Sequence, residues 1–456
     1  MMDKGFVEEI TGLLGESEGC KLIEALGTEP SVSVRVNLAK CGLPSGRRKV
    51  AWCGNGLYLD NRPAFTFDPL LHAGAYYVQD ASSMFICHVL RQIAGDNPVA
   101  YLDLCAAPGG KTTAALDVLD SGSLVVANEI DRQRAQVLRE NVIKWGRTNC
   151  VVTNDSPQKF GRLKSFFDII AADMPCSGEG MFRKDDEAVR QWSPSLVRQC
   201  AARQREIADS VWDALKPGGY MVYSTCTFNR QENEENVDYL IHKYGAEPVR
   251  IEIAPGWNIS GGVGTTAHCY RFMPHRTEGE GLFVAVLRKP GQYQGCHVKI
   301  AKEKNIPVPK PCRAFVKENT GIELSVDGGM VVARPAGLSR QIMAIRRNTN
   351  AILSGVPVAT IKGKDVVPEH AIALSTVFNK ESFNVLDVGY SQAIAFLRGE
   401  ALTVDSAVPR GYCLVSYGGY PLGWLKNVGN RTNNCYPKEW RIRAQTAPDA
   451  PPVVLL

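Results

Sequence analysis

The chain lacks the long apolar runs that mark membrane proteins. No stretch approaches the roughly 18 consecutive apolar residues that a bilayer-spanning helix needs. The first ten residues, Met1–Ile10, contain no basic segment followed by a long apolar one, which argues against a signal peptide. We therefore expect a cytoplasmic protein that does not enter a membrane.

The sequence also lacks paired cysteines, although it contains 14 cysteines in all. None of them has the Cys-x-x-Cys spacing typical of structural zinc sites, so no metal site is expected. A disulfide framework is typical of short exported chains, and this chain has 456 residues. Most of the cysteines, such as Cys87 and Cys150, are therefore expected to be buried free thiols.

The chain has only a small excess of positive charge, +5, but this charge is unevenly distributed along the sequence. Residues 291–456 contain 20 Lys or Arg and 12 Asp or Glu, a net charge of +8, so the first 290 residues carry −3. A basic C-terminal third beside a slightly acidic body is what a polyanion-binding appendage would look like. The alternative is a basic surface that serves only solubility.

The pattern of apolar segments predicts an α/β fold in a chain of two to four domains. A helix over 5–26 and a strand over 31–37 form a small N-terminal unit, and strand and helix segments then alternate up to about residue 290. Predicted strands are 100–105, 124–128, 150–153, 167–172, 220–224 and 282–287, and predicted helices are 112–119, 132–145 and 194–215. Such alternation indicates a mostly parallel, Rossmann-like sheet that binds ligands beyond the carboxyl ends of its strands.

A proline-punctuated linker is predicted around 289–311. Short alternating strands are predicted after it, at 330–333, 412–417 and 440–443, followed by an irregular tail. This pattern differs from the strand–helix alternation before the linker, so further domains are expected here.

A glycine turn after the first strand of the alternating region predicts a cofactor site. The turn lacks the G-x-G-x-x-G and P-loop spacings, so a dinucleotide or a nucleoside triphosphate is disfavoured. An acid at the end of the next strand, Glu129, is placed to accept hydrogen bonds from a ribose, and Asp155 is placed to meet an adenine amino group. This order favours S-adenosylmethionine over NAD, and the turn consists of Cys105, Ala106, Ala107, Pro108, Gly109, Gly110 and Lys111.

Two thiols, Cys176 and Cys226, each follow an apolar strand-like run, so both are expected at strand ends beside this cofactor site. A thiolate that adds to carbon 6 of cytosine makes carbon 5 nucleophilic enough to accept a methyl group. A second group must help to remove the carbon 5 proton before the thiolate leaves. Asp173 is placed to bond the edge of a flipped cytosine or to contact the cofactor. A lone cysteine would more often be inert core, but two at the edge of a cofactor site favour chemistry.

The ordered motifs of the chain resemble those of the Nol/Nop/Sun family of RNA (cytosine-5) methyltransferases, and within it the bacterial ribosomal RNA enzymes of the RsmF type. The matching stretches lie between about residues 30 and 290, with further similarity at Gly423-Trp-Leu-Lys426 and Tyr436-Pro-Lys-Glu-Trp-Arg441. They are Val78-Gln-Asp-Ala-Ser-Ser83, Leu104–Lys111, Asp173-Met-Pro-Cys-Ser-Gly-Glu-Gly180, Tyr223-Ser-Thr-Cys-Thr-Phe-Asn229 with Glu232-Asn-Glu-Glu235, and Arg271-Phe-Met-Pro-His-Arg276 with Gly279-Glu-Gly281.

The resemblance implies that Cys226 is the nucleophile and that Cys176 assists product release. DNA cytosine-5 methyltransferases use the Pro-Cys thiol instead, which would promote Cys176, but the Ser-Thr-Cys-Thr motif favours Cys226. It also implies that 105–111, Glu129, Asp155 and Asp173 line the S-adenosylmethionine site.

The resemblance further implies a small-subunit (16S) ribosomal RNA substrate, and we expect a monomer. Transfer RNA remains an alternative substrate, and a non-catalytic ribosome-assembly factor that binds RNA is an alternative of another class.

Four domains are expected on this basis: a small α+β unit over 1–75, the methyltransferase domain over 76–290, an α+β linker domain over 291–375 and a PUA-like β-barrel over 376–456. In the last domain aromatic and cationic residues are interleaved, and we expect the rings to fill the core while the cations face RNA. These residues are Trp424, Lys426, Tyr436, Lys438, Trp440, Arg441 and Arg443.

Overall fold

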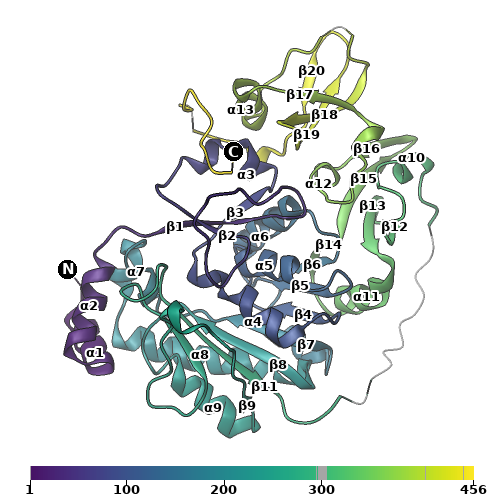
Figure 1. Cartoon of the computed structure of the whole chain (residues 1–456). Helices are drawn as coiled ribbons and strands as arrows, with labels where there is room; N and C mark the ends of the chain where they lie inside the picture. Colours follow the sequence, from purple (N-terminus) through teal and green to yellow (C-terminus); the bar gives the residue numbers. More distant parts are fainter. Residues whose placement is uncertain (1, 294, 296–305, 406, 445, 456) are drawn as a thin grey trace.

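A nine-stranded sheet forms the centre of the computed structural model, which describes residues 2–293, 295, 306–405, 407–444 and 446–455 (Figure 1). The strand order is β10-β11-β8-β7-β4-β5-β6-β14, and β9 pairs with β11. The five strands from β8 to β6 run parallel, whereas β9, β10, β11 and β14 are antiparallel to their neighbours. The strands are β4 (Ala100–Asp103), β5 (Leu124–Asn128), β6 (Cys150–Thr153), β7 (Phe167–Asp173), β8 (Leu215–Thr225), β9 (Glu247–Pro248), β10 (Cys269–Phe272), β11 (Leu282–Arg288) and β14 (Ala351–Ser354).

Helices cover both faces of this sheet, which confirms the predicted α/β class. Successive residues of β5 face opposite sides: Val125 belongs to an apolar core that includes residues of α4, α5 and α6, and Val126 belongs to a separate core that includes residues of α8 and α9. Burial on both faces explains why these strands are continuous apolar runs. The helices are α4 (Phe85–Ala94), α5 (Gly110–Val118), α6 (Arg132–Trp145), α7 (Asp186–Gln191), α8 (Pro194–Val211) and α9 (Glu234–Tyr244).

The predicted helix over 5–26 is wrong as a single element, because the structure has a hairpin of α1 (Lys4–Leu14) and α2 (Glu16–Leu26). Gly15 separates them with φ of +80°, a backbone conformation that glycine adopts without steric cost. The hairpin then buries Phe6 and Ile10 against α7 and its surroundings. The apolar spacing was compatible with one helix, but only the turn lets both halves reach the same apolar surface.

A three-stranded antiparallel sheet of order β2-β1-β3 lies beside α5 and α6 (Figure 1). Its strands are β1 (Val32–Val36), β2 (Gly56–Leu59) and β3 (Tyr76–Val78), and α3 (Pro69–His72) precedes β3. The central strand β1 is buried, including the charged side chain of Arg35, which has no exposed surface.

Two further sheets follow in the C-terminal third. The first has the order β12-β13-β15-β16 and consists of β12 (Ile322–Asp327), β13 (Met330–Pro335), β15 (Val356–Lys362) and β16 (Asp365–Pro368), with α10 (Lys310–Arg313), α11 (Ser339–Asn348) and α12 (His370–Ala373). The second has the order β17-β18-β19-β20 and consists of β17 (Asn384–Asp387), β18 (Gly411–Tyr417), β19 (Tyr420–Asn427) and β20 (Thr432–Asn434), with α13 (Tyr390–Arg398).

The C-terminal third is joined to the central sheet by β14. Residues Ala351–Ser354 leave α11 and pair with Val151–Thr153 of β6, so a strand from beyond the linker forms one edge of the methyltransferase sheet. Part of the predicted linker at 289–311, namely residues 294 and 296–305, lies outside the described residues.

The predicted strand over 440–443 is wrong. A 3-10 helix occupies Lys438–Trp440, and the following residues have no strand partner among the described parts of the chain. Ile442 is buried and donates one backbone hydrogen bond to the carbonyl of Leu397, so the segment packs against α13 without joining a ladder. Its alternating pattern therefore reflects one-sided burial alone. Among the described residues no helix is long and apolar enough to cross a membrane.

Candidate active site

The two thiols lie side by side at the carboxyl edge of the central sheet. Cys226 directly follows β8, and Cys176 follows the neighbouring parallel strand β7 by three residues. Their Sγ atoms are 3.1 Å apart, and both side chains are partly exposed. The two sulfur atoms can therefore reach the same bound molecule.

The surroundings of Cys176 favour its protonated form. The hydrogen bond with Cys226 and burial raise the pKa of the Cys176 thiol well above its usual value. Cys176 therefore keeps its proton at neutral pH and can be the hydrogen-bond donor to Cys226 Sγ.

The loops after β7 and β8, which carry Cys176 and Cys226, are held together by buried polar side chains. No role was predicted for these side chains from the sequence. Glu179 accepts hydrogen bonds from the backbone N–H groups of Phe228 and Asn229, at 2.7 and 3.0 Å. Glu232 accepts one from the N–H of Ser177, next to Cys176, at 3.0 Å. Both glutamates occur in the motifs quoted above, but only their burial, at 1% and 0% exposure, marks them as parts of the scaffold.

The loops also meet through their backbones. The N–H of Gly180 donates to the carbonyl of Cys226 at 2.8 Å, and a Cβ atom at Gly180 would lie only 2.9 Å from that oxygen. A larger residue at this position would separate the loops, which explains the glycine in the Pro-Cys motif.

Lys111 and Asp173 stand between the thiols and the glycine turn. Lys111 Nζ is 2.8 Å from Asp173 Oδ2, and Ser224 Oγ donates to Asp173 Oδ1 at 2.8 Å. Burial alone would lower the pKa of Lys111, but the nearby carboxylates of Asp173 and Asp103 outweigh it and raise that pKa above its usual value. Lys111 is therefore a half-buried cation at the site.

The predicted glycine turn borders a cavity of about 220 Å³. The turn joins β4 to α5. Gly109, the residue before the helix, has φ of +113°, a backbone conformation that suits glycine. Of the predicted residues the cavity is lined by Cys105, Ala106, Ala107, Pro108, Gly110, Lys111 and Asp173. Gly109, Glu129 and Asp155 do not line it.

Glu129 and Asp155 lie at the ends of the next two strands, as predicted. Asn128 links these ends to the turn, because its side-chain amide donates to the carbonyls of Leu104 and Asp155 at 3.1 and 3.0 Å. The Glu129 carboxylate is buried and lies 3.6 Å from Arg134, which also donates to the carbonyl of Ala107 at 2.9 Å. The three strand ends thus form one polar edge around the turn.

Asp155 also has a partner that the sequence did not indicate. Its carboxylate accepts a hydrogen bond from the N–H of Asn350, the residue before β14. The edge that carries the predicted adenine contact is therefore tied to the C-terminal third.

The cavity wall contains buried polar atoms that have no hydrogen-bond partner among the described residues. Two of them are Gln79 Nε2, a donor, and Asp103 Oδ1, an acceptor. Burial raises the pKa of Asp103 to about 7, against the opposing hydrogen bond from Thr112 to its other oxygen. Unsatisfied buried polar atoms are costly, so this wall fits a polar ligand with acceptor and donor groups.

A parallel sheet with such a turn, an acid at the next strand end and unpartnered polar atoms in the cavity wall suits S-adenosylmethionine, which carries a ribose and an amino-acid group. The fold and site define an S-adenosylmethionine-dependent methyltransferase of the α/β class. Comparison with known proteins narrows this class.

Three family models match the chain in order. The N-terminal domain of 16S rRNA methyltransferase RsmF matches residues 2–81, 16S rRNA methyltransferase RsmB/F matches 91–288, and the Methyltransferase RsmF PUA domain matches 383–442. Proteins named ribosomal RNA small subunit methyltransferase F are similar over most of their length. The protein of Shewanella oneidensis is 32% identical over 432 residues, covering 89% of this chain and 90% of the relative, and that of Klebsiella pneumoniae is 30% identical, covering 89% of each.

The chain therefore belongs to the RsmB/F family of 16S rRNA (cytosine-5) methyltransferases, with the N-terminal and PUA domains of the RsmF type. Solved structures share the fold over about two thirds of this chain. NSun6 from Pyrococcus horikoshii has a TM-score of 0.55 at 21% identity, covering 64% of this chain and 99% of that chain. A methyltransferase homologue from the same organism has a TM-score of 0.53 at 25% identity, covering 63% of this chain and 95% of that chain.

Proposed function

We propose that this enzyme methylates carbon 5 of a cytosine in 16S ribosomal RNA through a covalent adduct between Cys226 and carbon 6 of the base. The observation that carries the proposal is the 3.1 Å separation of the Cys176 and Cys226 sulfur atoms at the ends of adjacent strands. One thiol can attack the ring while the other remains within reach of the adduct.

Cys226 is the nucleophile in this proposal, and Cys176 assists release. The Cys226 thiolate forms a bond to carbon 6, and the electron pair of the 5,6 double bond moves so that carbon 5 can take a methyl cation. S-adenosylmethionine, when bound, supplies that methyl group on a positively charged sulfur. Loss of the carbon 5 proton to a base restores the double bond and expels Cys226 as a thiolate.

The division of roles is supported by the protonation of Cys176. A thiol with a raised pKa is a poor nucleophile in the resting enzyme, because only the thiolate attacks. Once Cys226 is bonded to the base, Cys176 is the remaining sulfur beside the ring. After losing its own proton to water, the Cys176 thiolate can accept the carbon 5 proton and serve as the base of the release step.

Lys111 and Asp173 are proposed to hold the base. The Asp173 carboxylate accepts from Ser224 and Lys111, and it can also accept from the amino group of a cytosine. The proposed cofactor contacts are residues 105–111, Glu129, Asp155 and Asp173. Glu129 is assigned to the ribose and Asp155 to the adenine.

The proposed RNA is that of the small ribosomal subunit, in keeping with the names of the relatives. The net charge of +8 over residues 291–456 supports a role of the C-terminal third in holding the RNA backbone. The predicted domain boundaries at 75, 290 and 375, the cytoplasmic location and the monomeric state remain predictions.

Methyl transfer from radiolabelled S-adenosylmethionine tests the proposal. We expect labelled 5-methylcytosine in small ribosomal subunits or in deproteinised 16S RNA from a strain that lacks the gene, and none in transfer RNA. Label in transfer RNA alone would favour the alternative substrate, and no label in any RNA would favour a non-catalytic assembly factor.

The same assay tests the thiols through covalent complexes. Cys176→Ala should accumulate a protein–RNA adduct that survives a denaturing gel, because the adduct forms but release is impaired. Cys226→Ala should form no adduct and should transfer no methyl group. An adduct in Cys226→Ala and none in Cys176→Ala would reverse the two roles. Cys200→Ala, which changes a partly exposed thiol on α8, is the matched control and should resemble the wild type.

A further inference from the structure

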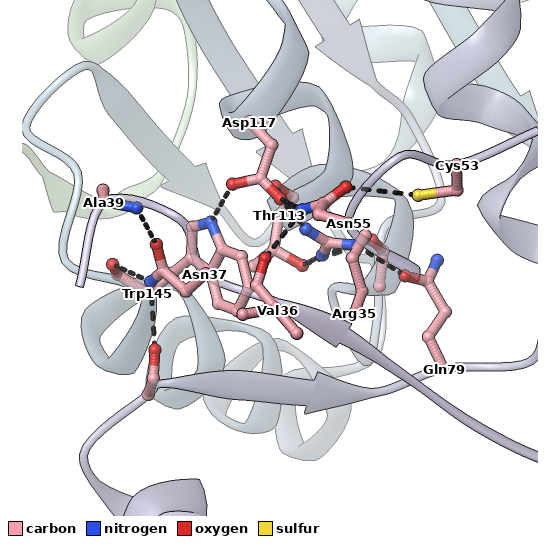
Figure 2. A network of polar contacts seen from close by, with 12 residues as sticks. Arg35, Val36, Asn37, Ala39, Cys53, Asn55, Gln79, Thr113, Asp117 and Trp145 are labelled. Atoms are coloured by element: carbon pink, nitrogen blue, oxygen red, sulfur yellow. Dashed lines mark hydrogen bonds and ion pairs between the residues drawn. The ribbon is translucent and has the colours of Figure 1, made fainter. Parts of the chain in front are cut away.

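Arg35 is a charged side chain with no exposed surface, at the centre of the N-terminal sheet. It forms an ion pair with Asp117 of α5, and Asp117 also accepts from Trp145 Nε1 and Asn55 Nδ2, at 2.9 and 3.1 Å (Figure 2). A buried cation is tolerated only when its donors are satisfied, so this network fixes the guanidinium tightly. The N-terminal sheet is thereby joined to the helix that starts at the glycine turn.

The same guanidinium orients the amide of Gln79. Arg35 Nε donates to Gln79 Oε1 at 2.8 Å, so the oxygen of the amide faces Arg35 and its nitrogen faces away (Figure 2). Since the two ends of an amide differ in hydrogen-bonding capacity, this bond decides that a donor faces the other way.

The donor end of the Gln79 amide lies beside Gly110, another residue of the cavity wall. Gln79 lines the cavity and is only 6% exposed, and its Nε2 has no partner among the described residues. A Cβ atom at Gly110, the first residue of α5, would lie 3.3 Å from Nε2. The buried donor therefore lies beside the N-terminus of α5, where a helix favours negative charge.

The charges of the cavity limit what this donor can bind. Asp80, Asp103 and Asp173 line the same cavity, and Lys111 is the only lysine or arginine among the described residues that line it. An RNA phosphate would meet three carboxyl groups there. The amino-acid group of the cofactor carries one carboxylate and one ammonium, and the unpartnered Asp103 Oδ1 is an acceptor for the latter.

We infer that Gln79 binds the carboxylate of the methionine moiety of S-adenosylmethionine, with Arg35 as the positioning residue that aims its amide. The inference rests on the cofactor of the family and adds a residue from outside the glycine turn and the strand ends. It makes the N-terminal sheet a part of the cofactor site as well as a neighbour of it.

Calorimetric titration of the full chain with two ligands tests this inference without any turnover. S-adenosylhomocysteine has the carboxylate, and its decarboxylated analogue, S-adenosyl-3-thiopropylamine, lacks only that group. Gln79→Glu keeps an acceptor for Arg35 but replaces the donor by a negative oxygen. We expect it to weaken S-adenosylhomocysteine binding by about tenfold or more, the range for a hydrogen bond to a charged group, and not to weaken binding of the analogue.

Gln79→Ala should show the same selectivity with a smaller loss, and it serves if Gln79→Glu does not fold. Gln199→Glu, an exposed change on α8, is the matched control and should bind both ligands like the wild type. Equal weakening for both ligands, or none for S-adenosylhomocysteine, would overturn the role of Gln79. A wild-type protein that binds neither ligand would instead contradict the cofactor assignment.

Discussion

Single residues at this site have properties that their neighbours impose on them. Cys176 and Cys226 are the same amino acid, yet the hydrogen bond and burial at Cys176 raise the pKa of that thiol and leave Cys226 as the proposed nucleophile. Asp103 and Asp173 are both carboxylic acids beside one cavity. Asp173 has Lys111 as its partner, whereas one oxygen of Asp103 has none among the described residues.

Asp103 should make the stability of the ligand-free enzyme depend on pH. Its pKa is raised to about 7 by burial, so the folded state binds this proton more tightly than the unfolded chain. The free energy of unfolding therefore falls as pH rises from the unfolded pKa toward 7, by at most about 1.4 kcal/mol per pH unit. Asp103→Asn should remove this contribution to the decrease in the free energy of unfolding. The variant should therefore be more stable than the wild type at pH 8.

Urea unfolding of both proteins at pH 5, 6, 7 and 8 measures the effect. Glu9, whose pKa burial also raises to about 7, titrates in both proteins, so the difference between them reports Asp103. Parallel pH profiles would contradict the assignment. Asp103→Asn should also weaken the binding of S-adenosylhomocysteine, because a neutral amide attracts the ammonium less.

At the scale of elements, the site depends on how two loops after β7 and β8 are held together. The carboxylate of Glu179 receives two backbone donors from the loop after β8 and one from the indole of Trp192 at 2.9 Å. Asn229 Nδ2 connects it to Glu232, with distances of 3.0 and 2.8 Å to the two carboxylates. This buried network sets the positions of the thiols without touching the base.

Glu179→Gln should lower the rate of methyl transfer while leaving cofactor binding unchanged. The amide presents a donor where the carboxylate accepts from backbone N–H groups, and a small displacement of reacting atoms is costly in rate. We expect kcat to fall by about tenfold or more, with the affinity for S-adenosylhomocysteine within about twofold of the wild type. Glu187→Gln, an exposed change on α7, is the control. Equal losses of kcat and affinity would indicate general unfolding instead of loop displacement.

The elements show which patterns a sequence can specify. The strands β5 and β6 and the helix α6 lie at their predicted bounds, because continuous buried runs and a capped helix are local signals. The helix over 5–26 and the strand over 440–443 were wrong, because apolar spacing records burial on one side but not the shape of the backbone. The strand β14 was not predicted, since its partner β6 lies about 200 residues earlier in the chain.

At the scale of the whole molecule, the basic C-terminal third is attached to the edge of the cofactor site. β14 extends the central sheet, and Asp155 accepts from Asn350 beside it. In β19 and the segment after β20, Trp424 and Tyr436 are buried in the core, as expected, while Lys438 and Arg443 are exposed. The other predicted residues, namely Lys426, Trp440 and Arg441, are half-buried. The two exposed cations are therefore available to the backbone of an RNA whose base enters the site.

Neutralising exposed cations of the C-terminal third should weaken the binding of RNA but not the binding of the cofactor. For Lys438→Ala with Arg443→Ala, we expect a several-fold higher KM for 16S RNA and an unchanged affinity for S-adenosylhomocysteine. The slope of log affinity against log salt should fall by about 0.7–0.9 for each phosphate that the variant no longer neutralises. Lys164→Ala, an exposed change within the acidic first 290 residues, is the control. An unchanged salt slope in the double variant would remove these two cations from the RNA interface.

The sequence by itself determined the class of fold, the glycine turn and the pair of cysteines, because these depend on residues close together in the chain. It placed Cys176 and Cys226 at strand ends, and parallel strands bring such ends to one edge. Only the tertiary structure decided that Arg35 fixes the orientation of the Gln79 amide, that Glu179 and Glu232 hold the loops after β7 and β8 together, and that β14 joins the central sheet. Each of these depends on contacts between distant segments, whose pairing is selected by burial and hydrogen-bond satisfaction over the whole molecule.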